Sequence, residues 1–186
     1  HLPAVELLLG AAYIHNGQHK KGVLLITNAL PRANRSQDWM KARARNALAM
    51  ICIQQADSIE LLGWEVQKDI ETRMRHLKKA EEQVIASVHL NKTAYILQGI
   101  IQMVDAYLRL YDDARTIAPP HSISSAKEDM YFRRLEKKSR SLLLRAENYL
   151  EKGMTISRRQ NWKGIESKQL QNRLSAVRAE KKRRED

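Results

Sequence analysis

Residues 8–30, LLGAAYIHNGQHKKGVLLITNAL, predict two α-helices that fold back on each other. In the first helix, Leu9, Ala12 and Tyr13 are spaced so that they share one face. Gly10 has no side chain, so a second helix can approach closely at this position. The first arm therefore has the features of a helix that packs tightly against a neighbour.

The elbow of this hairpin falls at residues 16–18, Asn-Gly-Gln. Gly17 supplies the left-handed backbone conformation that commonly ends a helix. In the second arm, Gly22, Ile26 and Ala29 lie three and four residues apart, which places them on one side of a helix. Small residues are thus expected where the two helices cross.

The hairpin resembles the tetratricopeptide (TPR) repeat, which places a large apolar residue, a small residue and Tyr on its first helix. Gly then marks the elbow, and small, aromatic and small residues follow on the second helix. The matching positions are Leu9, Gly10, Tyr13, Gly17, Gly22, Ile26 and Ala29. The resemblance covers about one repeat and implies a right-handed stack of antiparallel helical hairpins. The alternative is an ordinary helical hairpin in an irregular bundle, because any tight helix pair favours small residues.

The remainder of the 186-residue chain has the composition of an all-α protein. It contains only seven Gly and four Pro, and its long segments are rich in Ala, Leu, Lys, Arg, Glu and Gln. Gly153 is expected to end one of the long helices. Apolar spacing predicts helices over residues 37–56, 65–90, 93–118, 125–152 and 155–184.

The predicted organisation is a helical-hairpin body over residues 1–118, a Pro-rich linker over 119–124 and two long basic helices over 125–186. Pro119 and Pro120 forbid continuation of a helix between the two parts. Residues 1–132 hold 16 Lys and Arg against 14 Asp and Glu, whereas residues 133–186 hold 17 against 7. The net charge of +12 is therefore concentrated in the C-terminal third.

Cysteine content and hydropathy bear on the cellular compartment. Cys52 is the single cysteine, so no disulfide can form within the chain, which is compatible with the cytoplasm or the nucleus. No apolar run approaches the roughly 20 residues that a membrane span requires, and we expect no membrane association. The chain begins at His1 without Met, so we expect it to be part of a longer protein.

The sequence offers little for catalysis or for cofactor binding. His15 and His19 are four residues apart, but Gly17 interrupts the helix between them and no further ligand follows at metal-site spacing. Asp112 and Asp113 are more typical of a solvated helix surface than of an acid/base pair. Phosphate-binding glycine loops and nucleophile elbows are absent from the sequence. We therefore expect no enzyme activity, no catalytic residue, no metal site and no cofactor.

Protein binding is the function that the TPR resemblance implies. Stacked helical hairpins leave a concave surface lined by the first helix of each pair. By this analogy the protein-binding surface includes Leu7, Ala11, Ile14 and His15. The alternative is that Leu7 and Ile14 pack against a helix of the longer protein.

The C-terminal cations are candidates for contacts with RNA or DNA, because affinity grows with the number of phosphates that a protein neutralises. The candidate residues are Arg133, Arg134, Lys137, Lys138, Arg158, Arg159, Lys163 and Arg173. Glu residues are interspersed among them, and no row of aromatic side chains supports base stacking. A charged helix that faces solvent or a protein partner is the favoured interpretation. A membrane-surface role is weaker still, because neither helix has a broad apolar face.

A finer likeness lies in the layout of residues 2–110, where a regular hairpin precedes one with a long charged elbow and the segment LKKAEEQVIASV. This layout resembles the N-terminal repeats of the TPR scaffold subunit of the polymerase-associated factor (PAF) transcription elongation complex. The likeness implies a nuclear scaffold that holds a helical segment of a partner subunit. The predicted function is a protein-interaction scaffold in a larger assembly, and the alternative is a basic helical domain that binds RNA or DNA.

Overall fold

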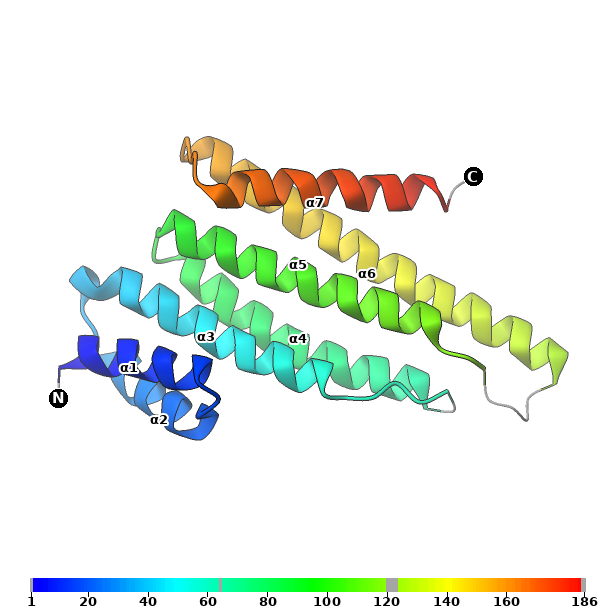
Figure 1. Cartoon of the computed structure of the whole chain (residues 1–186), viewed down its shortest axis with the longest axis horizontal. Coiled ribbons are helices and arrows are strands. Elements are labelled where there is room, and N and C mark those ends of the chain that lie inside the picture. Colours follow the sequence, from blue (N-terminus) through cyan, green and yellow to red (C-terminus); the bar gives the residue numbers. More distant parts are fainter. Residues whose placement is uncertain (1, 64, 120–123, 185–186) are drawn as a thin grey trace.

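The computed structural model describes residues 2–63, 65–119 and 124–184, and this part of the chain is all-α (Figure 1). The helices are α1 (Pro3–His15), α2 (His19–Ala29), α3 (Asp38–Asp57), α4 (Val66–Val88), α5 (Thr93–Thr116), α6 (Ser125–Arg159) and α7 (Ile165–Lys182). Two 3-10 turns, Leu30–Arg32 and Arg35–Gln37, connect α2 to α3. The described residues contain no β-strand, so the predicted fold class is confirmed.

Helices α1 and α2 form an antiparallel pair whose crossing requires glycine on both sides. A Cβ atom on Gly10 would lie 2.7 Å from Cγ1 of Ile26, and one on Gly22 would lie 2.5 Å from Cγ1 of Ile14. These distances are shorter than van der Waals contact, so neither position has room for a side chain. Gly17, in the turn between the helices, has a φ angle of +78°, which favours glycine.

The face of α1 that enters the core differs from the predicted one. Leu9 is 42% exposed, whereas Leu7, Ala11 and Ile14 are fully buried. The prediction considered one neighbouring helix, but α1 packs against both α2 and α3. Two neighbours cover a different and wider part of the helix surface than one does.

Helix α3 separates two hydrophobic clusters. One side of α3 supplies Ala44 and Ala47 to a cluster with α1 and α2. Its other side supplies Ala49 and Ile53 to a larger cluster that includes residues of α4, α5, α6 and α7. The small Ala side chains allow close neighbours on both sides of the helix.

The helices pack in a regular order along the chain. Helix α3 pairs with α4, and α5 pairs with α6. Helix α5 also contacts α3 and α4, and α7 packs against both α5 and α6 (Figure 1). None of the helices in the described segments is both long enough and apolar enough to cross a membrane.

A buried arginine holds the segment between α3 and α4 against the helices. Arg73 of α4 is 6% exposed, and its guanidinium donates to the Ile59 carbonyl at 2.6 Å and to Asp113 of α5 at 2.5 Å. An arginine that is buried in this way needs both partners, because an unpaired buried charge is costly. The segment that contains Ile59 is thus linked to α5 through Arg73.

The hydrophobic core crosses the predicted boundary between body and tail. Leu142 and Leu150 of α6 and Leu170 of α7 belong to the same buried cluster as α3, α4 and α5. The division into a body over 1–118 and separate helices over 125–186 therefore does not match the core. Of the predicted linker over 119–124, residues 120–123 lie outside the described residues.

Gly153 lies inside α6 and does not end a helix as predicted. Helix α6 continues to Arg159, and the chain turns at Asn161, where φ is +47°. A Cβ atom on Gly153 would lie 3.0 Å from Leu170 and 3.2 Å from Ile100. This glycine lies where α7 and α5 approach α6 closely. Because α6 continues to Arg159, the last helix begins at Ile165 instead of residue 155.

Replacing Gly22 with Ala is expected to lower the free energy of unfolding by about 1–3 kcal/mol, measured by urea denaturation. The new methyl group would meet Ile14 at 2.5 Å and the Gly10 carbonyl at 2.6 Å. The better helix propensity of Ala, about 1 kcal/mol, is too small to offset this overlap. The exposed Thr27 on the same helix is the control, and Thr27→Ala should change stability by less than about 0.5 kcal/mol. Equal stability of Gly22→Ala and the parent protein would contradict the close crossing.

Candidate protein-binding groove

Two cavities lie end to end between α4 and α6, both of which pack against α5. The first has a volume of about 860 Å³ and lies between residues 68–81 of α4 and 138–145 of α6. The second, of about 690 Å³, lies between residues 84–89 and 148–159. Residue numbers rise in the same direction along both walls, so α4 and α6 run parallel. We refer to the two cavities together as the α4–α6 groove.

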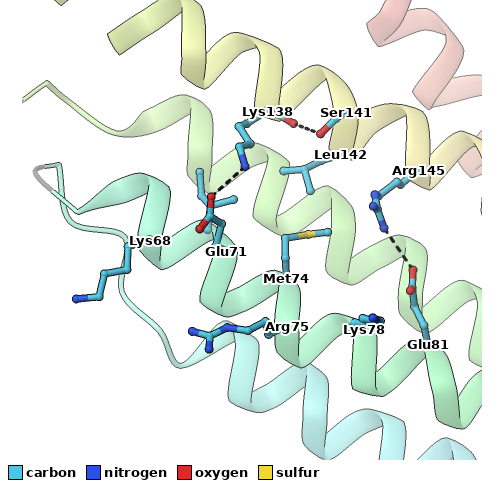
Figure 2. Close-up of a pocket in the computed structure, with 11 residues that line it drawn as sticks. Lys68, Glu71, Met74, Arg75, Lys78, Glu81, Lys138, Ser141, Leu142 and Arg145 are labelled. Carbon is cyan, nitrogen blue, oxygen red and sulfur yellow. Dashed lines mark hydrogen bonds and ion pairs between the residues drawn. The ribbon is translucent and has the colours of Figure 1, made fainter.

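The α4–α6 groove has apolar side chains along its length. Figure 2 shows Met74 of α4 and Leu142 of α6 facing each other in the first cavity. Val88 and Ile156 line the second cavity, together with Ile85, which is 52% exposed. Exposed apolar surface in a groove is typical of sites that bind other molecules.

Two ion pairs cross the first cavity from one wall to the other. Lys138 of α6 lies 3.4 Å from Glu71, and Arg145 lies 3.9 Å from Glu81 (Figure 2). The side chains of Lys138 and Arg145 are about half exposed, so these pairs contribute little to stability. The cations therefore remain accessible to a ligand in the groove.

A tyrosine pair lies where the two cavities meet. The buried Tyr107 hydroxyl of α5 donates to Oε1 of Glu81 at 2.5 Å, and its ring stacks on Tyr149 at a centroid separation of 6.1 Å. Burial raises the pKa of the Tyr107 phenol above its ordinary value, and the neighbouring Glu81 carboxylate raises it further. Tyr107 therefore orients Glu81 from beneath the groove.

A row of cations follows α6 beside the groove at intervals of seven residues. Its members are Lys138, Arg145, Lys152 and Arg159. Seven residues are close to two helical turns, so the row stays on one side of α6 and repeats at about 10.5 Å. We call these four residues the α6 basic row.

On α7, much of the positive charge is paired with carboxylates of α5 and α6. Arg173 donates two hydrogen bonds to Asp105, at 2.7 and 2.9 Å. Arg178 and Lys181 both contact Glu147, and the hydrogen bond from Lys181 is the main reason that the pKa of Glu147 lies below its ordinary value. These pairs attach the basic C-terminal helix to the body of the protein.

Comparison of the chain with protein-family models, with curated protein sequences and with solved structures gives no significant match. In the described part of the chain, no three His, Cys, Asp or Glu side chains are placed to hold a metal ion. A functional assignment therefore depends on the positions, charges and exposure of the side chains in the structure.

The predicted protein-binding residues do not form an open surface. Leu7, Ala11 and Ile14 are buried among α1, α2 and α3, so the prediction that they contact a partner is wrong for these three. The alternative, that Leu7 and Ile14 pack against a helix of the longer protein, is not needed either, because both belong to a buried cluster with α2 and α3 of the same chain. His15 is exposed at the end of α1.

The predicted nucleic-acid residues do not gather in one place. Arg133, Arg134 and Lys137 are exposed near the start of α6, while Arg158 and Lys163 are exposed at its other end. Arg133 and Arg158 lie 25 positions apart along α6, which corresponds to about 37 Å. Of the remaining predicted residues, Arg173 is paired with Asp105, and Lys138 and Arg159 line the α4–α6 groove.

Sequence reasoning missed most of the α4–α6 groove. Lys152 and Ile85 were not among the predicted site residues. The seven-residue spacing of the α6 basic row was a usable signal. The sequence carried no such signal for the pairing of α6 with α5, because the doubled proline separates the two helices.

Alkaline unfolding is expected to report the buried Tyr107 phenol. The folded protein retains this proton at pH values where the unfolded chain loses it, so the unfolded state binds fewer protons. The free energy of unfolding should therefore fall above about pH 10, by about 1.4 kcal/mol per pH unit for one such group. In Tyr107→Phe the decline should be shallower, as measured by urea denaturation between about pH 8 and pH 12. Parallel pH profiles for the two proteins would show that the phenol is not shielded in the folded state.

Proposed function

We propose that this chain is a non-enzymatic helical module that binds a protein partner in the α4–α6 groove. The main support is an open groove in which exposed apolar side chains, such as Ile85, lie between charged walls. An apolar strip with a polar rim is the usual form of a site for a peptide segment or a helix. The proposed setting is a larger assembly, in the cytoplasm or the nucleus.

The order of helix packing supports a scaffold of helical hairpins. Each of α3, α5 and α7 contacts the two helices that precede it in the chain. In arrays of helical hairpins, every new pair packs on the preceding pair in this way, and the exposed surfaces bind partners. The TPR resemblance of residues 8–30, and the weaker likeness to the PAF scaffold subunit, agree with this proposal. The contact surface that we propose lies on α4 and α6 and not on α1.

Nucleic-acid binding through the C-terminal helices is the alternative. It is supported by the exposed cations Arg158 and Lys163 at one end of α6 and Arg133 and Arg134 at the other. The separation of these groups and the ion pairs of α7 reduce the number of phosphates that one ligand could contact. We therefore regard protein binding as the better-supported function.

A selection from a random peptide display library tests the proposal without assuming a ligand sequence. We expect the protein to select peptides whose binding weakens about tenfold or more in Ile85→Glu, because the new carboxylate replaces apolar contact area in the groove. Ile85 is half exposed, so the substitution should change the stability of the protein by less than about 1 kcal/mol. Fluorescence anisotropy with the selected peptides gives the dissociation constants.

The matched control is Leu24→Glu, since Leu24 is 62% exposed on α2 and lines neither cavity of the groove. This variant should retain full affinity for the selected peptides. Failure to select peptides, or equal losses in the two variants, would overturn the proposal. Tight salt-sensitive binding of RNA or duplex DNA that is lost in a variant with Arg133, Arg134, Arg158 and Lys163 changed to Gln would support the alternative.

A further inference from the structure

We propose that the ligand of the α4–α6 groove is an acidic amphipathic α-helix of about 20 residues that carries carboxylates at seven-residue intervals. This inference rests on the proposed function, since it assigns the chemistry of a partner to the same groove. Three features of the groove lead to it, namely the spacing of its apolar residues, the α6 basic row and the helical nature of both walls.

The half-buried residues of the groove repeat every seven positions on both walls. On α6 these residues are Tyr149 and Ile156, which continue from the buried Leu142. On α4 they are Met74 and Val88, with Glu81 between them. A seven-residue apolar repeat keeps a seam aligned along a helix, and a partner helix with the same repeat matches it over its full length.

The α6 basic row sets the charge of the partner. Its four cations repeat at about 10.5 Å, which is the distance between equivalent positions in successive heptads of a helix. From Lys138 to Arg159 the row extends about 32 Å, the length of a helix of about 21 residues. One Asp or Glu in each heptad of a partner helix would therefore reach each cation in turn.

The groove as a whole has an excess of positive charge. Among the described residues that line the two cavities, seven are Lys or Arg and three are Glu. Glu151 is already paired with Arg178, and the pair between Lys138 and Glu71 is exposed to solvent. Carboxylates of a partner can replace the weak cross-groove pairs and gain contacts with cations that lack a strong partner.

The walls of the groove favour a helix over other anionic ligands. Both walls are α-helices, whose backbone N–H and C=O groups are bonded internally, so an extended peptide finds no strand edge to pair with. Tyr149 and His89 are the aromatic side chains among the described lining residues, and they come from opposite walls, so they do not form a row on which successive bases could stack. An apolar strip beside a cationic row instead matches the two faces of an amphipathic helix.

A synthetic peptide of about 21 residues tests this inference with the full chain. The peptide has Leu at the a and d positions of three heptads and Glu at e and g, where like charges disfavour pairing of the peptide with itself. Anisotropy of the fluorescein-labelled peptide should give affinity about tenfold or more above that of two control peptides at about 0.15 M ionic strength. One control has Lys in place of Glu, and the other has the same composition in a scrambled order.

Neutralising the α6 basic row should weaken binding of the acidic peptide about tenfold or more. The test variant carries Lys138→Gln, Arg145→Gln, Lys152→Gln and Arg159→Gln. The matched control carries Arg133→Gln, Arg134→Gln, Lys137→Gln and Lys163→Gln, which removes four cations that do not line the groove. This control should retain affinity within about twofold, because exposed charges that do not contact the ligand contribute little at this ionic strength. If the test variant unfolds, Lys152→Gln and Ile85→Glu are measured singly in its place.

Four outcomes would overturn the inference itself. Equal binding of the acidic and basic peptides would exclude the charge assignment, and equal binding of the acidic and scrambled peptides would exclude the helical repeat. Competition by an RNA of similar length at equal affinity would assign the α6 basic row to phosphate. If display-selected peptides bind in an Ile85-dependent manner but the acidic helix does not, this inference fails and the proposed function stands. If no peptide shows weaker binding to Ile85→Glu, the proposed function fails, and the inference fails with it.

Discussion

Helix α5 has apolar residues over most of its circumference, and covering them is the constraint on which the rest of the structure depends. Ile96, Leu97, Ile100 and Val104 are buried, and Tyr107 is fully enclosed, while a polar stripe that includes Gln98 and Arg109 is exposed. A helix with so wide an apolar surface must be covered by several others. Four neighbours, α3, α4, α6 and α7, meet this requirement. The helices on either side of the doubled proline are therefore joined by one core.

The α4–α6 groove follows from this arrangement. Helices α4 and α6 both pack against α5 and run parallel to each other. Cavities lie between them, so their facing surfaces are partly uncovered. Side chains that reach across the gap, such as Lys138 and Arg145, do so through weak exposed ion pairs. The stacked rings of Tyr107 and Tyr149 close the core below without filling the groove. A surface that is apolar, elongated and rigidly supported is suited to recognising another helix.

Charge has two separate roles in the C-terminal third. On α7, Arg173 and Arg178 contact carboxylates of α5 and α6, so their charge serves to attach the last helix. On α6, the basic row faces the groove, where carboxylates are fewer than cations. Net charge alone does not separate the two roles, because they differ only in what lies opposite each side chain. The assignment of a positively charged segment to nucleic acid is weakened for the same reason.

The sequence by itself determined that the chain is helical and where most of the helices lie, since periodic apolar residues, Gly17 and the paired prolines act within a few positions of the chain. It also determined the small residues at the crossing of α1 and α2. Tertiary structure alone decided which face of each helix is covered, because that depends on neighbours distant in sequence. Leu7 is buried instead of Leu9 because α3 lies beside α1, and Gly153 is a contact point instead of a helix end because α7 folds back there. The groove also depends on tertiary structure, since its walls are helices distant in sequence that both pack against α5.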